Sequence, residues 1–200
     1  MPNWCYTSYV IEGYKEELQS LYEKLCSLDN LPEPRDLTSF GKLGLDNVVE
    51  LFGGDPEQID CRGELNDTPQ LAVVLTFDTM TAWSELNEVW NLVMNRYKTL
   101  KYYYRAEEGG SYYYVTNDAD GKYFGRYLVD ELRGEPEYYN TVEVLLSDIS
   151  ERTGATLTSW EMMEAELERY NEAHEDDPLF VHEFHIVKDQ AAGTNSSAVF

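Results

Sequence analysis

Basic residues are scarce in this sequence. Only 15 lysines and arginines stand against 38 aspartates and glutamates, so the formal charge at pH 7 is −23. A protein of this charge is repelled by nucleic-acid phosphates and anionic membrane surfaces, and it is attracted to basic protein surfaces. The charge therefore disfavours nucleic acids and membranes as direct partners and favours a basic protein partner.

Cysteines and long apolar runs are also few. The three cysteines, Cys5, Cys26 and Cys61, are far apart and form no C-x-x-C pair, which argues against a zinc ribbon and a disulfide framework. The first residues lack the basic and apolar regions of a signal peptide, and no apolar run approaches the roughly 20 residues that cross a bilayer. These absences predict a soluble cytoplasmic protein with reduced thiols.

Recognised catalytic and cofactor motifs are absent as well. The chain contains no G-x-S-x-G, no H-E-x-x-H and no P-loop. His182 and His185 fall on opposite faces of a predicted strand, so they are not expected to share a metal ion. Paired carboxylates are abundant, but a chain this acidic yields such pairs by chance. We therefore expect no catalytic residue, no metal ligand and no cofactor, and a protein that is not an enzyme.

Apolar and aromatic residues, in contrast, are plentiful. Hydrophobic residues make up 42% of the 200 residues, which is enough for a sizeable core, and 16 of the residues are tyrosines. Tyrosine packs like an apolar residue and keeps a hydroxyl for a partner, so it is common on binding surfaces. It is also a good strand former, which is the simpler explanation of its abundance.

Hydrophobic periodicity predicts an α+β fold. The order strand, helix, strand, strand, helix, strand is that of the ferredoxin-like split β-α-β motif. The predicted strands and helices of this motif cover, in chain order, residues 4–11, 14–28, 58–65, 70–77, 82–97 and 100–107. The second helix would place Trp83, Leu86, Val89 and Trp90 on its inner face.

The rest of the chain is expected to elaborate the same sheet. A hairpin extension, then two helices and a strand, would cover 111–116, 123–132, 140–153, 159–174 and 179–187. We therefore predict a ferredoxin-like domain over 1–132, an acidic helix-helix-strand elaboration over 133–188 packed on it, and a flexible tail over 189–200.

Three features resemble a known family. They are the opening Met1-Pro2-Asn3-Trp4-Cys5, the strand end Phe77-Asp78-Thr79 leading to Trp83, and the Tyr97, Leu100 and Tyr102 entry into a strand that reaches Glu107-Glu108-Gly109. Over about residues 1–130 the chain resembles the YubB-like ferredoxin-like family of phages, plasmids and conjugative elements. The resemblance implies a ferredoxin-like fold and a mobile-element origin, and it brings no established activity.

The predicted last helix presents a stripe of carboxylates. Its apolar face comprises Trp160, Met163, Leu167 and Tyr170. The stripe follows i, i+3 and i+4 spacing and continues into two aspartates; its residues are Glu161, Glu164, Glu168, Glu172, Glu175, Asp176 and Asp177. Acids nearby in the chain would extend it if the fold brings them together: Asp130, Glu131, Glu135 and Glu137.

Such a stripe is either a solvated helix face or a binding surface. Carboxylates about 5–6 Å apart along a helix imitate the phosphates of one DNA strand. The sequence therefore favours a protein-binding inhibitor that acts as a DNA mimic. Its target would be a host nucleic-acid-binding defence protein, so the inhibitor would have an anti-restriction or anti-CRISPR role against the corresponding nuclease.

One segment supports an alternative function. It is basic and aromatic, and with the following hairpin it includes Arg96, Lys98, Lys101, Tyr102, Tyr104, Arg105, Tyr112 and Tyr114. If the four tyrosines share a sheet face, they could stack single-stranded bases as RRM modules do. Against this interpretation, the RRM consensus is absent and the net charge opposes phosphate binding, so cross-strand tyrosine packing remains the other explanation.

Overall fold

The computed structural model describes residues 3–32, 40–132 and 134–188 and has an α+β fold. Its contacts divide the chain into two units, Met1–Asn117 with Val187–Phe200, and Asp118–Ile186. The division falls after Asn117, earlier in the chain than the boundary at 132 that the sequence suggested. None of the helices in the described ranges combines the length and apolar composition needed to cross a bilayer.

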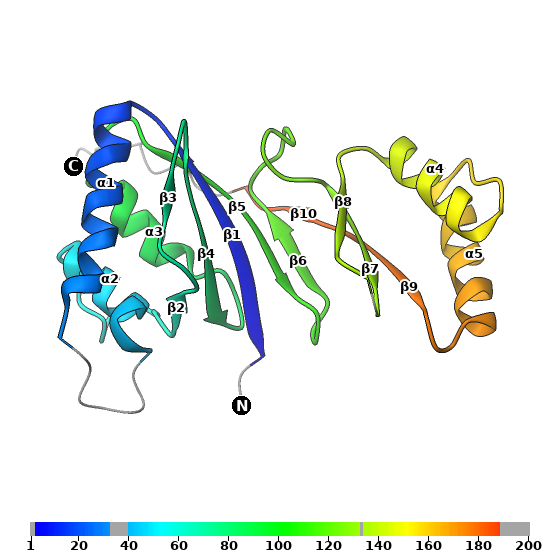
Figure 1. The fold of residues 1–200 in the computed structure, drawn as a ribbon, viewed down its shortest axis with the longest axis horizontal. Helices are drawn as coiled ribbons and strands as arrows, with labels where there is room; N and C mark the ends of the chain where they lie inside the picture. Colours follow the sequence, from blue (N-terminus) through cyan, green and yellow to red (C-terminus); the bar gives the residue numbers. More distant parts are fainter. Residues whose placement is uncertain (1–2, 33–39, 133, 189–200) are drawn as a thin grey trace, which may run out of the picture. The chain divides into compact units, whose positions relative to one another are not determined.

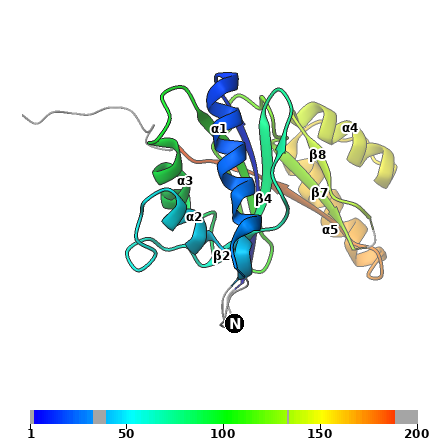
Figure 2. The same ribbon diagram turned by 60° about the vertical axis from the view of Figure 1, so that its left-hand side comes forward.

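The first unit contains most of the predicted strands and helices. In chain order they are β1 (Trp4–Glu12), α1 (Lys15–Cys26), the 3-10 turns η1 (Ser27–Asn30) and η2 (Gly41–Leu43), α2 (Leu45–Leu51), β2 (Gly63–Leu65), β3 (Gln70–Leu71), β4 (Leu75–Ala82), α3 (Asn87–Met94), β5 (Lys101–Glu108) and β6 (Tyr113–Thr116). Figure 1 shows α1, α2 and α3 on the same face of the sheet, and Figure 2 shows this layer from another side.

The sheet of the first unit is antiparallel, with neighbouring strands in the order β6-β5-β1-β4-β2. Because successive side chains of a strand point to opposite faces, alternate residues of β1 are buried under the helices, among them Cys5, Thr7, Tyr9 and Ile11. Tyr9 is paired with Phe77 on β4 and lies in the centre of this face.

The core of the first unit lies between this face and the helices. Leu18, Leu21 and Leu25 recur at helical spacing on α1 and are fully buried. From α3, the Trp90 ring packs 4.6 Å from Phe77 between ring centroids. Apolar periodicity alone therefore accounts for how these helices cover the sheet.

The second unit contains β7 (Tyr127–Glu131), β8 (Glu137–Tyr139), α4 (Val142–Thr153), α5 (Trp160–Ala173), β9 (Leu179–Glu183) and β10 (His185–Ile186). A separate antiparallel sheet has the order β8-β7-β9. Its core joins Val129 and Leu179 of the sheet to Leu145 and Ile149 of α4 and Met163 of α5.

Several predictions about elements are wrong. The strand predicted at 70–77 is divided into β3 and β4, and only residues 63–65 of the strand predicted at 58–65 form β2. The strand predicted at 123–132 does not extend the first sheet, because β7 pairs with β8 and β9 instead. The helix predicted at 82–97 begins only at Asn87. Trp83 and Leu86 precede it with φ values of 73° and 52°, and Trp83 is exposed rather than on an inner helix face. The packing of the 133–188 segment on the first sheet remains a prediction.

Candidate functional site

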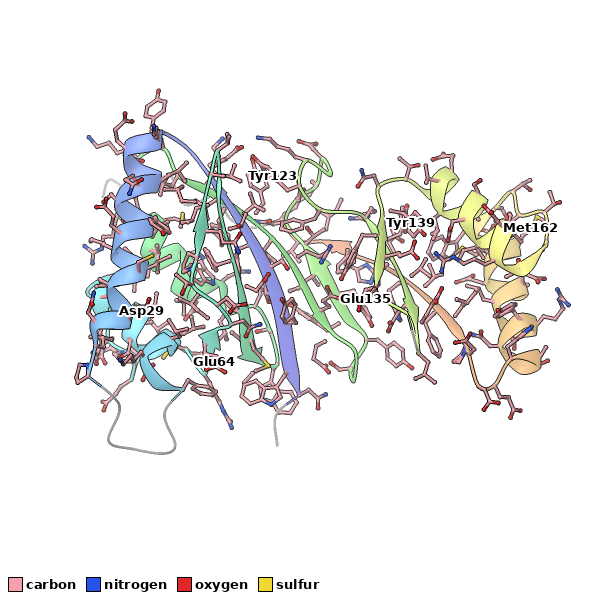
Figure 3. The ribbon with its side chains drawn as sticks, in the orientation of Figure 1. Asp29, Glu64, Tyr123, Glu135, Tyr139 and Met162 are labelled. Carbon is pink, nitrogen blue, oxygen red and sulfur yellow. The ribbon has the colours of Figure 1, made fainter. Side chains whose placement is uncertain are left out.

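All seven carboxylates predicted to form a binding surface are exposed. We call this surface the acidic face; it comprises Glu161, Glu164, Glu168, Glu172, Glu175, Asp176 and Asp177. Met163 and Leu167 bury the opposite side of α5 against α4 and the sheet, which turns the glutamates toward solvent. Met162 marks the first turn of this helix in Figure 3.

The helix does not contain the whole face. α5 ends at Ala173, so Glu175, Asp176 and Asp177 lie in the turn that leads to β9 and do not continue the helical stripe. At the other end, the Ser159 side chain accepts a hydrogen bond from the Met162 N–H and caps the helix.

Among the residues that the structure describes, no basic side chain pairs with the acidic face. The one basic residue of α5, Arg169, pairs with Glu166 and lies outside the stripe. None of the ion pairs among the residues that the structure describes involves the seven carboxylates. Residues 118–186 contain 18 of the 38 acidic residues but only 5 of the 15 basic ones. Negative potential is therefore concentrated in this unit.

Some of the acids that were expected to extend the acidic face form ion pairs within the second unit. Arg152 of α4 pairs with Glu131 on β7, with Glu137 on β8 at 2.8 Å and with Asp148 at 2.5 Å. Hydrogen bonds from Arg152 and from the Tyr139 hydroxyl lower the pKa of Glu137 (Tyr139 is labelled in Figure 3). Two of the four additional acids thus hold α4 against the sheet.

The predicted base-stacking surface is not formed by the residues proposed for it. Tyr104 is 0% exposed and Tyr114 is 8% exposed. Tyr102 and Tyr104 point to the helix-covered face, where the Tyr102 hydroxyl donates to Asn91 at 3.0 Å. Tyr114 is paired with Glu107 and therefore lies on the other face, and Tyr113 lies on the face of Tyr104 instead.

The basic residues of the same segment are also separated. Lys101 and Arg105 alternate with Tyr102 and Tyr104 along β5, so they point to the opposite face of the sheet. Arg105 pairs with Glu107. Arg96 donates to the Phe52 carbonyl at 2.7 Å, while Lys98 and Tyr112 are exposed on loops outside the strands. The eight residues proposed therefore do not share one surface, and core packing explains Tyr102 and Tyr104.

A buried carboxylate at Glu85 organises the tyrosines. Its two oxygens accept hydrogen bonds from Tyr113 at 2.6 Å and from Tyr104 at 3.1 Å, and Asn87 donates at 2.8 Å. Tyr9 donates to the Glu85 backbone carbonyl at 2.6 Å. We call these five residues the Glu85 cluster.

Sequence reasoning missed the Glu85 cluster. The helix predicted at 82–97 included Glu85, whereas α3 does not begin until Asn87, and no role was expected for this carboxylate. Burial, followed by the negative charge of Glu85, raises the pKa of Tyr9 well above its ordinary value. The cluster is buried and its carboxylate has three donors, so it stabilises the loop between β4 and α3 rather than forming an open site.

No group of three or more side chains suited to a metal ion occurs among the residues that the structure describes. No protein-family model matches the chain, and comparisons with curated proteins and with solved structures also give no match. The function of the protein is therefore inferred from the chain's own surfaces.

Proposed function

We propose that this protein is a non-enzymatic binding protein whose acidic face occupies a basic, DNA-binding surface of another protein. The observation that supports this proposal is the exposure of all seven carboxylates without an ion pair among the described residues. Like charges one turn apart on a helix are mildly destabilising, so folding alone gives no reason for the stripe. A cationic partner would offset the repulsion between these carboxylates, which gives a reason for the stripe.

The dimensions of the acidic face suit this role. A helix of 14 residues is about 21 Å long, at a rise of about 1.5 Å per residue. One strand of B-DNA places a phosphate about every 3.4 Å along the axis, so about six phosphates span the same length. α5 itself carries four of the carboxylates over this length, and the three acids of the following turn lie beyond it and bring the total to seven.

The first unit supports a ferredoxin-like fold, and with it a relationship to the YubB-like family of mobile elements. Counting β1, β2, β4 and β5 as the four strands of the motif, their order in the sheet is fourth, first, third, second. A mobile-element origin makes a host restriction or CRISPR nuclease a fitting target, since such enzymes present basic channels to DNA.

The test is capture from host lysate. The tagged protein is immobilised, lysate is applied, and retained proteins are eluted with duplex DNA and identified by mass spectrometry. We expect a basic nucleic-acid enzyme in the DNA eluate. Because the contact is electrostatic, 0.5 M salt should also release it.

Two charge variants sharpen the test. The first carries Glu161→Gln, Glu164→Gln, Glu168→Gln and Glu172→Gln. Its control neutralises four exposed glutamates of the first unit, at positions 16, 23, 50 and 57. Both variants have the same net charge, so loss of binding in the first alone assigns the contact to the acidic face. Equal retention of the partner by both variants, or retention that 0.5 M salt leaves unchanged, would contradict the proposal.

A further inference from the structure

Three exposed aromatic side chains lie near the end of the first sheet where β1 begins and β4 ends, and the Trp4 ring packs edge-on against Phe40 with 5.8 Å between ring centroids. Trp4 is 40% exposed, Tyr6 is 42% exposed and Trp83 is 56% exposed. We call them the aromatic patch. Trp4 and Tyr6 alternate with buried residues of β1 and therefore lie on the face that the helices leave open. The Trp83 N–H donates to the Asn3 carbonyl at 3.0 Å, so the backbone of Trp83 follows Ala82, the β4 residue that is paired with Trp4.

The chain holds Trp83 in this position at a conformational cost. A non-glycine residue with φ of 73° is uncommon, and such residues concentrate at functional sites. The surrounding loop is tightly bonded: Thr81 donates to the Ser84 carbonyl at 2.5 Å, and the Glu85 cluster anchors the next residue. These hydrogen bonds thus fix a strained loop that exposes the Trp83 indole to solvent.

Two carboxylates, Glu64 and Asp78, lie on the sheet face of Trp4 and Tyr6. Met80 is paired with Tyr6 on one side and with Glu64 on the other, which places Glu64 within two strands of the Tyr6 ring. Glu64 is labelled in Figure 3, at the end of the sheet where β1 begins and β4 ends. Asp78 is paired with Ser8, two residues along β1 from Tyr6, and therefore lies on the same face as Tyr6. Burial, followed by the charge of Asp78, raises the pKa of Tyr6.

The protein's own cations do not fill this surface. Lysines lie over the rings of Phe52 and Tyr123, but no cation of the described chain lies over the three rings of the patch. Arg105, on the same face, pairs with Glu107 at 3.4 Å. Arg62 lies at the margin, just before β2, and has no ion pair among the described residues.

We infer that the aromatic patch, with Glu64 and Asp78, is a second docking surface that takes an arginine-bearing segment of a basic protein. A guanidinium group stacks on indole and phenol faces and pairs with carboxylates, so it satisfies both kinds of group present. The inference deepens the proposed function, on which it rests: the basic partner would contact the patch through arginine side chains in addition to the acidic face.

The test uses the indole N–H signals of the four tryptophans in a ¹H–¹⁵N spectrum. The probe is a peptide of alternating glycine and arginine at low ionic strength, and its control replaces arginine by the neutral isostere citrulline. We expect the Trp4 and Trp83 signals to shift saturably with the arginine peptide and far less with citrulline. The buried Trp90 is the internal reference, and Trp160, which precedes Glu161 at the start of α5, is the tryptophan nearest in sequence to the acidic face.

Three variants test whether the peptide binds at the aromatic patch. Trp83→Ala should weaken peptide binding at the remaining patch signals about two- to fivefold, the factor that one exposed cation–π contact gives. Glu64→Gln with Asp78→Asn should weaken it without removing a ring. Tyr14→Ala is the matched control, because Tyr14 is 70% exposed and lies outside the patch, and it should leave binding unchanged.

The outcomes separate the two proposals. Shifts at Trp160 alone would overturn the docking surface and leave the acidic face standing. Shifts at Trp4 and Trp83 alone, with no loss of partner capture in the α5 variant, would support the patch and contradict the acidic face. Equal shifts with arginine and citrulline, or stronger shifts with single-stranded oligo(dT), would overturn the assignment to an arginine-bearing segment.

Discussion

Replacing Tyr113 by phenylalanine should destabilise the first unit by about 2 kcal/mol, roughly twice the cost of the same change at Tyr102. The Tyr113 hydroxyl donates to the Glu85 carboxylate at 2.6 Å, and hydrogen bonds to charged groups contribute about 1.5–3 kcal/mol. The Tyr102 hydroxyl donates to the neutral amide of Asn91 at 3.0 Å, for which about 0.5–1.5 kcal/mol is usual. Both changes remove one oxygen and leave the ring.

The assay is urea unfolding followed by tryptophan fluorescence. Trp160 is the one tryptophan in the second unit, so a Trp160→Phe background makes the signal report on the first unit alone. Stability differences come from the unfolding midpoints, provided that the slope m is unchanged. Equal costs for the two tyrosines, or no cost at Tyr113, would refute the assignment of a charged acceptor at Glu85.

A double-mutant cycle isolates the charge. In a Glu85→Gln background the acceptor of the Tyr113 hydroxyl is neutral, so Tyr113→Phe should cost about 1 kcal/mol less than in the parent protein. An unchanged cost would mean that the hydroxyl is stabilised by some other group.

Other predictions concern pH, an ion-pair cluster and a helix end. Burial raises the pKa of the Cys5 thiol from 9.0 to about 11, so the folded state retains its proton longer than the unfolded state. The stabilisation that results is fully present below pH 9 and is lost as pH rises toward 11, by at most about 3 kcal/mol. Urea unfolding at pH 8 and at pH 10.5 measures this loss of stability, and the loss should be smaller in Cys5→Ala than in the parent protein. Because Arg152 lowers the pKa of Glu137, that carboxylate stabilises the second unit at pH values above its ordinary pKa and ceases to do so in acid. Arg152→Leu should therefore destabilise the second unit at pH 7 and destabilise it less at pH 3. Unfolding followed by circular dichroism measures both effects. Gly154 ends α4 with φ of 73° and has nothing within 4 Å of an added Cβ, so Gly154→Ala should cost about 1 kcal/mol from backbone strain alone, whereas no thermal shift would contradict that account.

Local patterns predicted the elements whose surroundings are simple. The strand expected at 4–11 is β1, the leucines at helical spacing form α1, and Gly154 ends α4 as expected. Each of these signals depends on residues close in the chain, so no distant contact needed to be known.

The predictions failed where distant residues decide the conformation. The apolar spacing of Trp83 and Leu86 fits a helix, yet both are left-handed because Tyr104 and Tyr113, from strands later in the chain, fix Glu85 between them. A propensity for helix is a weak effect beside buried hydrogen bonds to a carboxylate.

The expected tyrosine surface does not form because of the pairing register between β5 and β6. Tyr102, Tyr104, Tyr112 and Tyr114 all have even numbers, which suggests one face if parity continues through the hairpin. The observed pairing of Glu107 with Tyr114 reverses parity between β5 and β6, and a change of one residue in register moves every side chain to the other face. The geometry of the turn between β5 and β6 decides this register, and the residues of the turn did not predict it.

Composition and helical spacing by themselves determined that this protein is strongly acidic, that it has an α+β fold and that a row of glutamates follows one side of α5. These properties depend on residue identity and on the 3.6-residue period, and neither requires a distant contact. Only the tertiary structure decided that β7 belongs to a second sheet, that Arg152 occupies two of the neighbouring acids, and that Trp83 is exposed. Strand pairing and ion pairs join residues far apart in the chain, and their partners are chosen by packing that no local pattern encodes.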